Sequence, residues 1–160
     1  MTYFRAVDPF PLESAEQTKL HEFYEYLAAS RLVTTACRGC KRMDWPPRCF
    51  CPQCGGDQYD WVDLPQEGVL HAFTVQETGV PAGFDKPLIF GIIKIHDLRL
   101  FSRLVETDPA ALGVGKRVRF TPLRVADDSE GKHRYLPGFT LNPEGDRCPR
   151  TGGGLFKIGA

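Results

Sequence analysis

The stretch Cys37–Gly56, CRGCKRMDWPPRCFCPQCGG, holds five of the six cysteines of this 160-residue chain. Four of the five form two Cys-x-x-Cys pairs, Cys37/Cys40 and Cys51/Cys54, and ten residues separate the pairs. Each pair can close a tight turn with both sulfurs aimed at one ion. Two such turns supply the four soft ligands of a tetrahedral zinc site. We therefore predict one structural Zn²⁺ per chain, bound by Cys37, Cys40, Cys51 and Cys54.

The residues around the cysteines fit such a site. Gly39 lies inside the first pair, and Gly55 and Gly56 follow the second, where a turn can need left-handed backbone. Zinc with four thiolates carries a net charge of about −2. Basic residues nearby can balance that charge, and we interpret them first as electrostatic support and second as a nucleic-acid patch: Arg38, Lys41, Arg42 and Arg48.

Two alternatives concern the metal site itself. Cys49 could replace Cys51 as a ligand, but the Cys-x-x-Cys spacing makes the better turn, so we interpret Cys49 as a small half-buried apolar side chain. Iron is the other alternative, because CPQCGG resembles half of a rubredoxin motif; the first half, CRGCK, has lysine after its second cysteine. Iron would make the chain an electron carrier with visible absorbance. A closed zinc site stabilises a fold and leaves no position for water activation.

Composition and charge narrow the class of protein. The formal net charge is zero and the pI is about 6.9, which gives no general attraction to nucleic acid or to anionic membranes. No apolar run approaches the length of a membrane span, and the N-terminal sequence MTYFRAVDPF lacks the apolar core of a signal peptide. Cysteines that bind a metal must remain reduced, which is typical of proteins in a reducing compartment. We expect a cytoplasmic protein.

The first half of the chain predicts a helix and a ribbon. Residues 1–12 indicate an extended arm, and Leu20, Phe23, Tyr24 and Leu27 recur at helical spacing within residues 13–30, with Ser14 as the expected cap. Residues 32–36 and 59–64 indicate two strands that the cysteine turns join into a zinc ribbon. We expect the prolines of DWPPR to stiffen the loop and project Trp45.

The second half predicts a barrel. Five strand-like runs are bounded by turn signals, with a helix-like segment, DPAALGVG, after the third. This order is that of an OB-fold barrel. We expect a mainly β fold with an N-terminal helix, divided into an N-terminal arm and helix (1–31), a rubredoxin-like zinc ribbon (32–65), a five-stranded OB-fold (66–141) and a C-terminal tail (142–160).

Several motifs together resemble a known family. They are FYEYLAASRLVTTACRGC, WPPRCFCPQCGG, GVLHAFTV and VETDPAALGVGKRVRF. Over residues 14 to about 143 the chain is similar to the acyl-CoA-associated family with a zinc ribbon and an OB-fold, first catalogued as a domain of unknown function. It departs from the family pattern at Lys41, where glycine is usual, and in its extra Cys49. Neither departure removes a ligand.

The resemblance implies a partner. Family members resemble small accessory subunits of acyl-CoA enzymes, above all thiolases such as benzoylsuccinyl-CoA thiolase, and also hydratases and retro-aldolases. The implied function is a non-catalytic subunit of a hetero-oligomer that supports assembly and acyl-CoA binding, with the CoA thioester possible at the shared interface. The resemblance does not locate any CoA-binding residue in this chain.

The residues themselves offer no catalytic group. A thiolase needs a nucleophilic cysteine with a histidine, whereas four cysteines here are assigned to metal and the four histidines share no motif. A nucleic-acid-binding OB-fold is the rival interpretation, since Phe101 would share a strand face with Arg99 and Arg103. Phe120 would lie opposite its neighbouring arginines, so no continuous aromatic and basic stripe is expected. We therefore expect no nucleic-acid partner.

The tail carries a separate hypothesis. After Gly152–Gly154 it ends in the apolar run LFKI, and leaving Leu155, Phe156 and Ile158 in water forgoes about 1.5–3 kcal/mol of burial each. We predict that these three side chains contact the catalytic partner. Truncation after Arg150 should leave the zinc content and the melting temperature of the lone subunit unchanged and should weaken assembly. A lower melting temperature with a fully active complex would instead place the segment on this chain's own surface.

Overall fold

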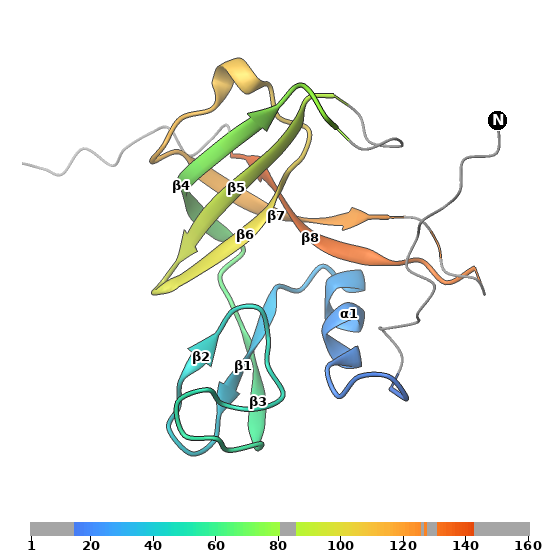
Figure 1. The fold of residues 1–160 in the computed structure, drawn as a ribbon, viewed down its shortest axis with the longest axis vertical. Coiled ribbons are helices and arrows are strands. Elements are labelled where there is room, and N and C mark those ends of the chain that lie inside the picture. The colour runs from blue at the N-terminus through green and yellow to red at the C-terminus, as the bar shows by residue number, and fades with distance from the viewer. Residues whose placement is uncertain (1–14, 81–85, 126, 128–130, 143–160) are drawn as a thin grey trace, which may run out of the picture.

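The computed structural model describes residues 15–80, 86–125, 127 and 131–142. Figure 1 shows a small three-stranded sheet beside one helix, with a barrel stacked above them. The expected N-terminal arm, the Ser14 cap, Cys148 and the tail residues Leu155, Phe156 and Ile158 lie outside the described residues. Within the described part, no helix is long and apolar enough to cross a membrane.

The helix α1 (His21–Ala28) is shorter than the sequence pattern predicts. The expectation of helix from residue 13 is wrong for residues 15–20, which form turns. Thr18 accounts for the difference, because its hydroxyl accepts a hydrogen bond from the Leu20 N–H at 3.1 Å. A side chain that bonds its own backbone in this way competes with helix formation. Phe23 and Leu27, one turn apart, are the buried residues of the helix.

The ribbon contains the two predicted strands and a third that the sequence did not reveal. β1 (Val33–Cys37) is central, between β2 (Met43–Asp44) and β3 (Tyr59–Asp63), and all pairing is antiparallel. The central position buries Thr34 and Thr35. Thr35 Oγ1 satisfies its hydrogen-bonding capacity by donating to the Arg48 carbonyl at 3.0 Å and accepting from the Arg48 N–H at 2.9 Å. These bonds fix the loop between the two cysteine pairs to the sheet.

Aromatic side chains join the helix to the ribbon. Phe23 of α1 packs edge-on against Trp45, with ring centroids 5.8 Å apart, and parallel to Trp61 of β3 at 6.5 Å. The expectation that DWPPR projects Trp45 outward is therefore wrong, because the indole packs against the core of the molecule. Trp61 Nε1 donates to the Glu22 carboxylate, and the Tyr59 hydroxyl donates to the Lys19 carbonyl at 2.9 Å.

The barrel is closed and has the predicted five strands in the order β4-β5-β6-β8-β7. Its one parallel pairing joins β6 to β8, and the others are antiparallel. The helix-like segment expected between the third and fourth strands contains a 3₁₀ helix, Pro109–Ala111, between β6 and β7. The Asp108 carboxylate caps this helix by accepting from the Ala110 N–H at 2.9 Å. The strands are β4 (Glu67–Gln76), β5 (Leu88–Ile95), β6 (Leu98–Leu104), β7 (Arg117–Arg124) and β8 (Tyr135–Leu141).

One core runs through the helix, the ribbon and the barrel. Leu27 and Val33 belong to the same buried cluster as Phe139 at the centre of the barrel. The helix α1 lies against both β1 of the ribbon and β8 of the barrel. The fold is therefore mainly β with one N-terminal helix, as predicted.

Candidate metal centre

Two equivalent turns hold the four predicted ligands. In the first, the Lys41 N–H bonds to the Cys37 carbonyl at 2.9 Å and the Cys37 N–H to the Arg42 carbonyl at 2.9 Å. In the second, the Gly55 N–H bonds to the Cys51 carbonyl at 2.9 Å and the Cys51 N–H to the Gly56 carbonyl at 2.7 Å. Lys41 and Gly55, at matching positions, both have left-handed backbone, with φ of 60° and 73°. The sequence repeat is thus also a structural repeat.

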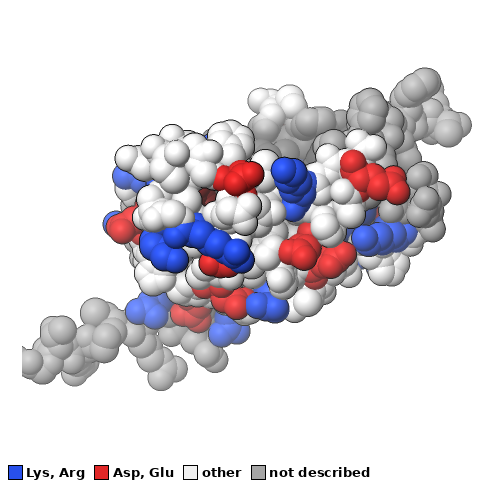
Figure 2. Space-filling model, turned by 90° about the horizontal axis from the view of Figure 1, so that it is seen from below, with Lys and Arg blue, Asp and Glu red and all other residues white. Residues whose placement is uncertain are grey.

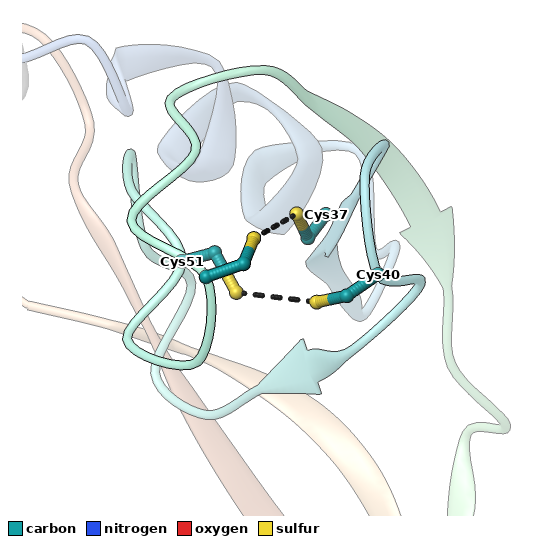
Figure 3. Close-up of side chains that lie close together, drawn as sticks. Cys37, Cys40 and Cys51 are labelled. Atoms are coloured by element: carbon teal, nitrogen blue, oxygen red, sulfur yellow. Dashed lines mark hydrogen bonds between the residues drawn. The ribbon is translucent and has the colours of Figure 1, made fainter.

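The four sulfurs converge on one space. All four Sγ atoms lie within 4.8 Å of one another, with Cys37 and Cys54 at 3.6 Å and Cys40 and Cys51 at 3.4 Å. Figure 3 shows Cys37, Cys40 and Cys51 pointing inward from their two turns. A tetrahedron with Zn–S bonds of about 2.3 Å has edges of about 3.8 Å. The spacing therefore fits a tetrahedral ion, and it is far longer than the roughly 2 Å of a disulfide.

Backbone N–H groups supply the local electrostatics. The Cys40 N–H donates to Cys37 and lowers the pKa of that thiol. The Cys54 N–H donates to Cys51 and, with the Gln53 N–H, lowers the pKa of that thiol to about 7. These donors stabilise thiolates, which are the metal-binding form of cysteine.

The second cysteine of each pair behaves differently. The Arg42 N–H lowers the pKa of Cys40, but hydrogen bonding with Cys51 and burial raise it, to about 11 overall. The Gly56 N–H likewise lowers the pKa of Cys54, while its contacts with Cys37 and Cys51 raise it overall. Four negative charges within 4.8 Å repel one another, and a divalent cation would remove that repulsion. The donor set therefore has the chemistry of a thiolate metal site.

Two of the four basic residues near the site, Arg38 and Arg42, have carboxylate partners. Arg38 forms an ion pair with Asp60 at 2.7 Å, and Arg42 pairs with Asp44 at 3.0 Å and donates to Gln53 at 3.1 Å. Arg38 thus pairs with a carboxylate of the neighbouring strand β3, and Arg42 with the carboxylate two residues further along its own segment, so aspartates meet the positive charge of these two arginines.

The remaining candidate residues lie apart from the cluster. Cys49 is half-buried and is not among the four converging sulfurs, as its interpretation requires. The histidine with carboxylate and guanidinium neighbours in the described residues is His133, which bonds Asp127 at 3.1 Å and Arg124 at 2.9 Å on an exposed hairpin of the barrel. Those contacts, led by the His133 hydrogen bond, lower the pKa of Asp127. No cysteine of the described residues belongs to this group.

Comparison with known proteins supports this site and this fold. Residues 25–60 match the family described as ChsH2, rubredoxin-like zinc ribbon domain, and residues 61–121 match ChsH2, C-terminal OB-fold domain. The two matches are adjacent and together cover more than half of the chain. The chain belongs to the ChsH2 type of the DUF35 family.

Relatives of this ChsH2-type chain include enzyme subunits. It is 32% identical over 96 residues to "Benzoylsuccinyl-CoA thiolase subunit BbsA" of Thauera aromatica, which is 59% of this chain and 65% of that protein. It is 25% identical over 117 residues to the "DUF35 domain-containing scaffold protein" of Methanothermobacter thermautotrophicus, covering 71% of this chain and 86% of that one. The match thus spans less than two thirds of the thiolase subunit.

A solved structure has the same fold. A chain of the structure described as "Ltp2-ChsH2(DUF35) aldolase" superposes with a TM-score of 0.64 at 26% identity and covers 76% of this chain and 93% of its own length. The ribbon and the barrel found here are therefore the architecture of a protein that is named together with an aldolase.

The matching turns generate a prediction about Lys41. Left-handed backbone costs a residue with a Cβ about 1–2 kcal/mol relative to glycine. Glycine offsets part of this advantage, because it loses more backbone entropy on folding. Lys41→Gly should therefore raise the free energy of unfolding of the metal-loaded protein by up to about 1 kcal/mol, measured by denaturant titration.

Gly55→Ala is the matched opposite change. A Cβ at Gly55 would meet nothing within 4 Å, so only the backbone conformation is altered. It should lower stability by about 1 kcal/mol. A loss of stability in Lys41→Gly would show that contacts of the lysine side chain outweigh its backbone strain.

Proposed function

We propose that this chain is a non-catalytic, zinc-binding accessory subunit of an acyl-CoA-processing enzyme, and that its partner is a thiolase-type catalytic subunit. The observation that carries the proposal is the closed four-sulfur cluster within a ChsH2-type ribbon and barrel. The thiolase subunit of Thauera aromatica is similar to this same region at 32% identity. The ribbon and the barrel would support assembly of the complex and binding of the acyl-CoA thioester at the shared interface.

The proposed metal is one Zn²⁺ on Cys37, Cys40, Cys51 and Cys54. When bound, it cross-links the two turns of the ribbon and contributes on the order of 10 kcal/mol of binding energy to folding. Four thiolates complete a tetrahedral shell, so no coordination position remains for substrate or water. The chemistry of the complex is therefore assigned to the partner.

A cytoplasmic location is part of the proposal. The described cysteines are free thiols, and free thiols that must stay available to a metal require a reducing compartment.

A second candidate function places the chain beside an aldolase. The relative described as "Ltp2-ChsH2(DUF35) aldolase" favours it, with a TM-score of 0.64. The two candidates assign the same role to this chain and differ in the reaction of the partner. They are distinguished by the reaction that the reconstituted complex performs, thiolytic cleavage with free CoA or aldol cleavage without it.

Serine substitutions test the metal assignment. Cys40→Ser should sharply lower the zinc content of the purified protein, measured by plasma mass spectrometry, because a hydroxyl is a poor ligand for zinc in place of a thiolate. Cys49→Ser is the matched control, since Cys49 lies in the same loop region and outside the cluster, and it should keep about one zinc per chain. Loss of metal in Cys49→Ser with retention in Cys51→Ser would show that the ligand set is wrong.

Reconstitution tests the role of the chain. The purified chain alone should not turn over acyl-CoA thioesters, and activity should require a thiolase-type subunit mixed with it. Analytical gel filtration should then show a mixed oligomer. Turnover by the isolated chain, with contaminating enzyme excluded, would falsify the accessory role.

A further inference from the structure

The outer face of three barrel strands has an unusual composition. Charged residues on the five barrel strands are mostly basic, with six lysines and arginines and a single acid, Glu67, although the net charge of the whole chain is zero. The Glu67 carboxylate forms ion pairs with Arg117 at 3.8 Å and with Arg119 at 3.5 Å. Both arginines belong to β7, which pairs with β4. On the β5–β6 side, the exposed Lys94 and Arg99 lie opposite each other with no carboxylate among the outward positions of the two strands.

The strand register places these outward residues in rows. Lys94 of β5 lies opposite Arg99 of β6, Ile92 opposite Phe101, and Phe90 opposite Arg103. The alternate residues of both strands point into the barrel and are buried, apart from the half-buried Leu98 at the start of β6, so these six point out. We name this set, Phe90, Ile92, Lys94, Arg99, Phe101 and Arg103, the β5–β6 face. Val69, Ala72 and Thr74 of β4 extend it, again without a carboxylate.

The centre of the β5–β6 face is apolar and open. Phe101 is 64% exposed, the largest exposed fraction of any aromatic side chain in the described part of the chain. The rings of Phe90 and Phe101 are stacked, with centroids 5.3 Å apart and 14° between their planes, and Ile92 lies directly across from Phe101. Two rings that support each other form a firm apolar platform with little side-chain entropy left to lose on binding.

We propose that the β5–β6 face binds the catalytic subunit, through an apolar ridge on that subunit bordered by aspartate or glutamate side chains. The inference rests on the proposed accessory role and assigns its interface. Aromatic residues and arginine at the centre of a patch are typical of the residues that dominate protein–protein binding. The basic border demands carboxylates on the other side.

Charge argues against other occupants. A second copy of this chain across a twofold axis would oppose Lys94, Arg99 and Arg103 with the same residues. The C-terminal segment 143–160 carries three basic and two acidic residues, so it does not complement the face either. Single-stranded nucleic acid needs a series of aromatic rings on which successive bases stack, whereas this face offers the one Phe90–Phe101 stack beside the aliphatic Ile92.

Substitutions on the face test the proposal in the reconstituted complex. Phe101→Asp should weaken binding of the thiolase-type subunit by about tenfold or more, measured by calorimetry or biolayer interferometry. Arg99→Glu should weaken it as well and reduce the dependence of binding on salt. Val114→Asp is the matched control, because Val114 is 68% exposed on the same barrel but lies outside the face, and it should bind like the wild type.

The controls separate the possible failures. Zinc content and melting temperature should match the wild type in each variant, and Arg99→Glu carries the test if Phe101→Asp does not fold. If Phe101→Asp and Arg99→Glu bind the catalytic subunit as the wild type does, this inference is overturned and the accessory role stands. If the wild-type chain fails to bind the catalytic subunit, both the accessory role and this interface are wrong. Binding of an oligothymidylate that Phe101→Asp abolishes, with catalytic-subunit binding unchanged, would assign the face to nucleic acid and overturn the inference.

Discussion

Four sulfurs within 4.8 Å of one another are the constraint on which the ribbon depends. Two turns of the same backbone design bring them together, and the turns are held by bonds between their own main-chain groups and by N–H donors aimed at sulfur. The strand β2 at one edge of the ribbon sheet has only two residues, so strand pairing alone holds the cysteine turns weakly. The loop between the turns therefore takes its position from the cysteines at both ends and from Thr35 at its middle.

The features that follow from spacing and alternation could be predicted from the sequence. Paired cysteines encode the metal turns, and alternating apolar residues encode five barrel strands, because both signals are local. Lys41 is the informative exception. Its departure from glycine is visible in the sequence, whereas its left-handed backbone, matched to that of Gly55, emerges only from the structure.

Features that depend on distant contacts could not be predicted. Trp45 packs against Phe23, a residue far earlier in the chain. Its sequence neighbours, Asp44 and Pro46, favour an exposed loop and do not reveal this contact. Arg38 directly follows Cys37 in the sequence and yet pairs with Asp60, which the pairing of β1 with β3 brings beside it. Figure 2 shows the molecule from the ribbon end. Acidic and basic side chains are interspersed on this face, and neither sign of charge forms a large patch of its own. The stacking of Phe90 on Phe101 likewise depends on the pairing register of β5 with β6, which the sequence does not specify.

The continuous core has a mechanical consequence. Leu27 is fully buried in a helix that touches β1 on one side and β8 on the other, so the ribbon and the barrel share packing rather than a hinge. Close-packed interiors are barely compressible and transmit displacement. The chain accordingly behaves as a rigid bracket, in which the span from the sulfur cluster to the outer wall of the barrel is fixed by packed side chains, and two bodies attached at its ends would be held at a set distance and angle.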